Sequence, residues 1–108
     1  MMEIKFKLSD RWGDTSLEGY ITTSYEKLVK IFGEPNSDGD GYKVSTEWSL
    51  EDELGNPATI YDWKSTNLYN DSSYSVADLR DEKKYEWHIG AENKHTANKL
   101  RNYILSQI

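Results

Sequence analysis

The chain has 108 residues, a formal net charge of −6 and no cysteine. This length suits one domain, and we expect a single α+β domain over residues 1–108. The absence of cysteine excludes disulfides, thiol nucleophiles and thiolate metal sites. The negative charge repels nucleic acid at long range, so we expect no direct DNA binding; it supports solubility and suits a partner protein with a basic surface.

The first strand is predicted over residues 3–8, where Ile4, Phe6 and Leu8 alternate with charged residues. A turn over 9–16 leads to a second strand at about 17–22. We expect these two strands to pair as a hairpin. Because residues 1–8 lack the apolar segment of a secretory signal, and no other stretch is long enough to span a membrane, we expect a cytoplasmic protein without membrane contact.

A helix is predicted next. Thr23 and Glu26 have the spacing of a capping box, and Gly33 and Pro35 are typical of a helix end. Apolar residues recur between them at helical spacing, at Tyr25, Leu28, Val29 and Phe32.

The segments 42–50 and 58–64 are predicted to form a second hairpin, because β-branched and aromatic residues alternate with polar ones. A helix capped by Ser45 and closed after Leu54 by Gly55 is the alternative. Residues 65–83 are predicted to be a long polar loop that packs onto the sheet or a partner, and the alternative is a flexible insertion with a turn of helix. A strand at 85–90 and a helix from about Asn93 complete the order β-β-α-β-β-β-α, an antiparallel sheet of about five strands with two amphipathic helices.

Motifs that carry chemistry are weak in this sequence. Residues 36–47 partly match a calcium-binding loop, but the first position is Asn36 and an apolar position holds Lys43, so we expect a loop without a metal. His88 could serve as a general base with Glu47 or Asp62, although a structural histidine is commoner. The sequence contains neither a GxSxG elbow nor a phosphate-binding glycine loop. We therefore expect a protein that is not an enzyme and uses no cofactor.

The aromatic residues divide between two sheet faces. Trp48 and Trp87 follow the apolar alternation and are expected beneath the helices, whereas Tyr61 and Trp63 share the opposite face. If that face is open, its rings can stack a base or anchor a protein. The candidate partner-binding residues are Trp12, Glu51, Asp52, Glu53, Tyr61, Trp63 and Lys64.

Four segments, 25–35, 47–48, 58–64 and 87–90, resemble small proteins encoded by bacteriophages and prophages, and these segments are spread over most of the chain. Many proteins of this kind block host defences, with anti-CRISPR inhibitors as an example. The resemblance implies an accessory protein that binds and inhibits a host defence protein in a bacterial cell. One alternative is a sponge that sequesters a nucleotide immune signal, with bases on Trp63 or Tyr61 and phosphates near Lys64 or Arg80. A small hydrolase built on His88 is the other alternative, and a homo-oligomer is also possible.

Overall fold

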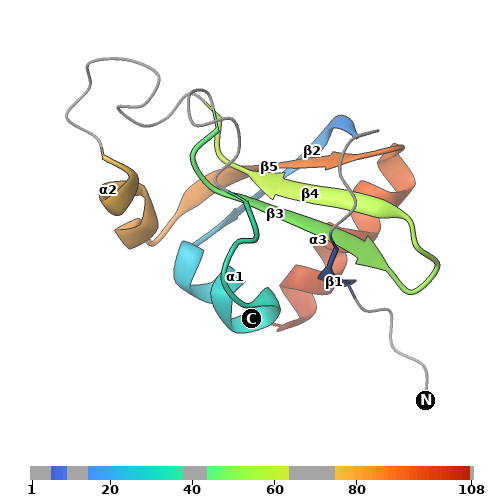
Figure 1. Ribbon diagram of the computed structural model, residues 1–108, viewed down its shortest axis with the longest axis horizontal. Helices are drawn as coiled ribbons and strands as arrows, with labels where there is room; N and C mark the ends of the chain where they lie inside the picture. The colour runs from blue at the N-terminus through green and yellow to red at the C-terminus, as the bar shows by residue number, and fades with distance from the viewer. Residues whose placement is uncertain (1–5, 10–14, 38–43, 64–74, 108) are drawn as a thin grey trace.

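A computed structural model describes residues 6–9, 15–37, 44–63 and 75–107 of the chain (Figure 1). Its elements are, in order, β1 (Phe6–Leu8), β2 (Ser16–Thr23), α1 (Tyr25–Phe32), β3 (Glu47–Asp52), β4 (Pro57–Tyr61), α2 (Val76–Asp81), β5 (Tyr85–Ala91) and α3 (Lys94–Gln107). The strands form one five-stranded antiparallel sheet. The predicted α+β fold class is thus confirmed, with one helix more than expected.

The sheet order is β1-β3-β4-β5-β2, so the predicted hairpin of the first two strands is wrong. β1 pairs with β3 at one edge, and β2 pairs with β5 at the other. Proximity in sequence favours a hairpin, but β2 pairs with β5 from Ser16 opposite Ala91 to Thr23 opposite Tyr85, with one irregularity between Leu17 and Gly19. The longer ladder of backbone hydrogen bonds therefore decides where β2 lies.

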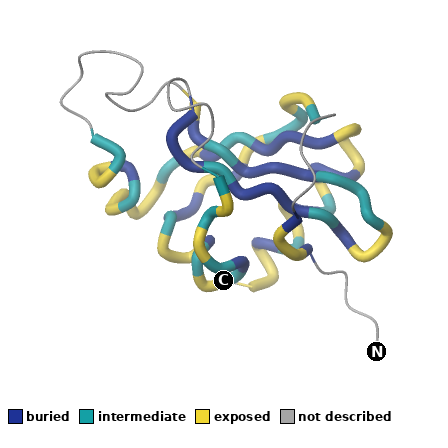
Figure 2. Tube along the Cα trace, viewed as in Figure 1, coloured by how far each residue is buried: buried dark blue, intermediate teal, exposed yellow. Residues whose placement is uncertain are grey.

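The two amphipathic helices, α1 and α3, pack on one face of the sheet (Figure 1). The core lies between these helices and the sheet, where Leu28 of α1 and Leu100 of α3 are fully buried against strand residues. At its centre the rings of Trp48 and Trp87 meet edge to face with centroids 5.5 Å apart, an arrangement worth about 0.5–1.5 kcal/mol beyond its buried area. The prediction that these two tryptophans lie beneath the helices is confirmed. Figure 2 shows that buried residues, in dark blue, run along the central strands.

The N-cap of α1 is Ser24, one residue later than predicted. Its hydroxyl oxygen accepts a hydrogen bond of 3.1 Å from the backbone amide of Lys27, whereas Thr23 still belongs to β2. The helix ends as predicted at Gly33, whose φ of 88° lies in the left-handed region that glycine tolerates best.

The second predicted hairpin is confirmed as β3 and β4. Asp52 organises its turn, because its Oδ1 accepts hydrogen bonds of 2.9 Å from the amides of both Leu54 and Asn56. Gly55 adopts a φ of 83° in this turn. The glycine thus serves the hairpin rather than the end of the alternative helix.

The additional helix, α2, falls within the segment 65–83 that was predicted as a long polar loop, and residues 65–74 of this segment lie outside the described part. Ser75 and Asp78 form a reciprocal capping box at its start. Leu79 is fully buried, and the Arg80 guanidinium lies 5.0 Å from the centre of the Tyr25 ring. These contacts attach α2 to α1. No helix in the described residues is long and apolar enough to cross a membrane.

Candidate functional site

Four ring side chains gather on the sheet face opposite α1 and α3, and we call them the aromatic cluster: Tyr20, Tyr61, Trp63 and His88. Tyr20 of β2 and Tyr61 of β4 both stand opposite His88 of β5 in the strand register. The His88 ring lies 5.0 Å from Tyr20, 5.4 Å from Tyr61 and 6.5 Å from Trp63, measured between centroids. His88 is therefore the centre of the cluster.

The outer rings of the cluster are open to solvent. Tyr20 is 44% exposed and Trp63 is 40% exposed, while Tyr61 and His88 are half-buried between them. Tyr61 and Trp63 share one face with centroids 6.4 Å apart, as the alternation predicted. Tyr20 is part of β2, and Trp63 follows two residues after the end of β4. Exposed aromatic rings offer large contact area at low cost in side-chain entropy.

Burial favours the neutral form of His88. Burial lowers the pKa of its imidazole, against the opposing influence of Glu86 and Asp62. Its Nδ1 is buried and has no hydrogen-bond partner in the part of the chain that the structure describes. At neutral pH the ring is therefore an uncharged aromatic surface, which suits stacking.

The general-base arrangement considered for His88 is not present in the described residues. Asp62 is fully buried and serves the opposite side of β4: its carboxylate accepts hydrogen bonds from the Ser45 amide (2.8 Å), the Ser45 hydroxyl (2.7 Å) and the Thr46 amide (2.9 Å). No hydrogen bond joins His88 to a carboxylate in the part of the chain described. His88 consequently lacks an acid that would orient it as a base.

The charges around the aromatic cluster are mostly negative. Alternation places Glu47, Glu51 and Glu86 on the same sheet face as His88, with Lys7 of β1 opposite Glu51. The pKa of Tyr61 is raised by burial, then by the negative charge of Glu47 and by Tyr20. This face thus favours a positively charged group over its rings.

The predicted acidic site residues fall in different environments. Glu51 is half-buried on the open face, and Glu53 is exposed in the turn, 3.3 Å from Lys99. Asp52 points to the helix face and is only 2% exposed, so it is not accessible to a partner. Trp12 and Lys64 lie outside the described residues.

Asp52 is instead a structural carboxylate. Burial alone would raise its pKa, but hydrogen bonds from Lys99 (2.8 Å), the Asn56 side chain (3.0 Å) and two backbone amides outweigh burial and lower the pKa to about 2. The link from Lys99 joins the β3–β4 turn to α3. Alternation along β3 explains why Asp52 faces the core although it lies between Glu51 and Glu53.

Sequence reasoning missed Tyr20 as a member of the site and gave His88 a different role. Both follow the strand alternation, since Tyr20 precedes the inward Ile21 and His88 lies between the inward Trp87 and Ile89. That signal identifies the outer face of each strand. It does not reveal that β2 and β5 are neighbours, which is what brings the two rings together.

The loop that partly matches a calcium site is only partly described, with residues 38–43 outside. Asn36 uses its side chain to join strand edges: Oδ1 accepts from the Ser49 amide at 2.8 Å, and Nδ2 donates to the Ser9 carbonyl at 2.9 Å. Over the described residues, no group of three or more His, Asp or Glu side chains is placed to hold a metal ion.

A comparison with known protein families and with curated proteins finds no match to this chain.

Proposed function

We propose that this protein acts by binding a partner protein through the aromatic cluster, and that it inhibits that partner as the resemblance to phage-encoded accessory proteins implies. The observation that carries the proposal is the exposure of Tyr20 and Trp63 around His88 on a sheet face without a described helix. Aromatic rings of this kind are the commonest anchors of protein interfaces.

The partner surface that fits this face is basic. Glu47 and Glu86 border the rings, Glu51 lies farther along the same face, and the whole chain carries a net charge of −6. An arginine of the partner can stack on Trp63 or Tyr20 while its charge is balanced by a neighbouring glutamate. The same field speeds the encounter with a cationic surface.

The sponge alternative has less support in the described residues. Of the two cations considered for phosphate, Lys64 lies outside them. Arg80 contacts the Tyr25 ring at 5.0 Å and donates to the Thr46 hydroxyl at 3.4 Å, and it forms no ring contact with Tyr61 or Trp63. A base stacked on the aromatic cluster would therefore lack Arg80 as its phosphate partner.

The binding test compares the wild type with a Tyr20→Ala/Trp63→Ala variant in a titration with a hexa-arginine peptide, followed by amide NMR shifts. We expect shifts at Tyr61 and His88 in the wild type and an affinity lower by at least roughly thirtyfold in the variant, since the loss of a single interface anchor already costs about 2 kcal/mol. The control is Leu105→Ala, because Leu105 is 45% exposed on α3. Equal affinity of all three proteins would refute the site.

The inhibitor role is tested by affinity capture from a bacterial lysate with the same three proteins. We expect one host protein to be retained in stoichiometric amount by the wild type and Leu105→Ala, and its activity to fall in their presence. Retention of the same proteins by the Tyr20→Ala/Trp63→Ala variant would contradict the proposal.

A further inference from the structure

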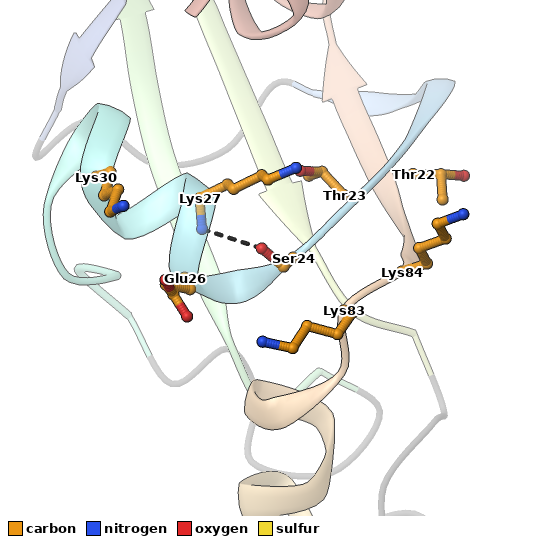
Figure 3. A pocket seen from close by; sticks show the side chains of 8 residues that line it. All are labelled: Thr22, Thr23, Ser24, Glu26, Lys27, Lys30, Lys83 and Lys84. Atoms are coloured by element: carbon orange, nitrogen blue, oxygen red, sulfur yellow. Dashed lines mark hydrogen bonds between the residues drawn. The ribbon is translucent and has the colours of Figure 1, made fainter. Parts of the chain in front are cut away.

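A pocket of about 470 Å³ lies where β2 passes into α1, away from the aromatic cluster (Figure 3). Its lining includes four lysines from two distant segments: Lys27 and Lys30 of α1, and Lys83 and Lys84 between α2 and β5. Figure 3 shows the two pairs of lysines on different sides of the β2–α1 junction. We call this the lysine pocket.

The positive charge of the lysine pocket stands out because the chain as a whole is acidic, with a net charge of −6. Glu26 is the one carboxylate among the lining residues, against four lysines. None of these lysines forms an ion pair with a described carboxylate, and all four are exposed. Gathering like charges is unfavourable unless an anion offsets them.

Two further groups at the pocket suit an anion. Thr23 lines it and is 3% exposed, yet its hydroxyl has no hydrogen-bond partner among the described residues. α1 also begins here: Ser24 accepts from the Lys27 amide, and the amides of the first two helical residues, Tyr25 and Glu26, have no acceptor within the helix. The helix start adds a partial positive charge that favours phosphate.

We infer that the lysine pocket binds a small anion that carries two or more phosphate groups. Its volume is in the range of small-molecule sites, at about 300–1,000 Å³. Each lysine acts as a separate point charge, so four ammonium groups match a ligand with several phosphates better than they match a single phosphate. A long nucleic acid extends over the acidic remainder of the surface and is repelled there, whereas a small ligand experiences mainly the local charge.

The test titrates the full chain with tripolyphosphate, pyrophosphate and orthophosphate at low salt, followed by amide NMR shifts at residues 22–30 and 83–84. We expect saturable binding that strengthens with the number of phosphates. The Lys83→Ala/Lys84→Ala variant should lose roughly tenfold or more in affinity for tripolyphosphate, because it removes two of the four lysines of the pocket. A tenfold loss corresponds to about 1.4 kcal/mol of binding free energy. Glu26→Gln should bind tripolyphosphate more tightly than the wild type.

The matched control is Lys94→Ala/Arg101→Ala on α3, which removes the same charge from two exposed positions. We expect its tripolyphosphate affinity to stay within about twofold of wild type, because separated surface charges are screened. An equal loss in both double variants, or no saturation in the wild type, would overturn the inference. So would a single-stranded oligonucleotide that binds more tightly than tripolyphosphate.

A comparison of ADP with pyrophosphate identifies the source of the phosphates. Tighter binding of ADP supports the site and points to a nucleotide, and equal binding supports the site and points to free polyphosphate. The inference is independent of the proposed function, because Tyr20→Ala/Trp63→Ala should leave tripolyphosphate binding unchanged.

Discussion

At the scale of single residues, Asp52 shows how a side chain in an acidic run becomes structural. Lys99 lies 47 positions later in the sequence, yet its Nζ is 2.8 Å from Asp52 Oδ2. The same carboxylate organises the β3–β4 turn. The buried Asp52 carboxylate therefore joins the β3–β4 turn to α3, so its ionisation is coupled to folding.

The pKa of Asp52 predicts a pH-dependent loss of stability. A pKa of about 2 in the folded state, against 3.8 for the free group, corresponds to about 2 kcal/mol of stability above pH 4. Because folding lowers this pKa, the contribution of Asp52 to stability is fully present at pH values above the pKa of the unfolded chain. It disappears as the pH falls toward about 2, the pKa of the folded protein. Asp52→Asn should therefore cost most at pH 7 and progressively less between pH 4 and pH 2, as measured by urea unfolding.

The control for Asp52 is Glu51→Gln, one residue earlier on the other sheet face. This change should alter the free energy of unfolding little at pH 7 and at pH 2.5. If the destabilisation caused by Asp52→Asn were the same at pH 7 and pH 2.5, the ion pair with Lys99 would not be its origin.

At the scale of elements, β5 is central because it joins β4 to β2. Gly90 allows this strand to approach its neighbours closely: a Cβ added there would lie 2.5 Å from Thr59 Oγ1 and 3.3 Å from Thr15 Oγ1. Gly19 of β2 differs, since among the described residues a Cβ at that position would meet only Ala97 Cβ, at an ordinary 3.9 Å. Contacts with neighbouring side chains therefore require a glycine at position 90, whereas position 19 has room for a methyl group.

Gly90→Ala is expected to destabilise the protein by about 1–3 kcal/mol, because the added methyl group overlaps buried neighbours. Thermal unfolding measures the effect. Gly19→Ala should be tolerated, and Thr59→Ala should reduce the cost of Gly90→Ala by removing the nearest atom. A cost of Gly90→Ala that is unchanged in the Thr59→Ala background would show that backbone conformation, rather than the contact with Thr59, requires glycine.

At the scale of the whole molecule, charge is divided between a negative face and a local positive pocket. The aromatic cluster is bordered by glutamates, and the lysine pocket lies at the β2–α1 junction. A cationic ligand is attracted by both its site and the net charge of −6, whereas an anion is attracted by its site and repelled by the remainder.

Salt should therefore affect the two ligands differently. Between 20 and 150 mM NaCl, we expect the affinity for hexa-arginine to fall by roughly tenfold or more, because screening weakens both the attraction by the site and the attraction by the net charge. The affinity for tripolyphosphate should fall less, since screening also removes the repulsion by the rest of the chain. Calorimetric titrations at both salt concentrations would measure this, and an equally steep fall for the two ligands would contradict the division of charge.

The amino-acid sequence by itself determined the features that depend on local periodicity. The apolar spacing of α1 and α3, the inward positions of Trp48 and Trp87, and the shared face of Tyr61 and Trp63 all follow from repeats of 3.6 or two residues. These patterns are local because side-chain direction is set by the element to which a residue belongs.

Only the tertiary structure decided which elements are neighbours. β1 and β2 were expected side by side and lie at opposite edges, Tyr20 reaches His88 only because β2 pairs with β5, and Lys99 reaches Asp52 from α3. The lysine pocket likewise needs α1 beside the start of β5. The physical reason is that strand pairing and helix docking are chosen by the burial and hydrogen bonding of the entire chain, which no local pattern records.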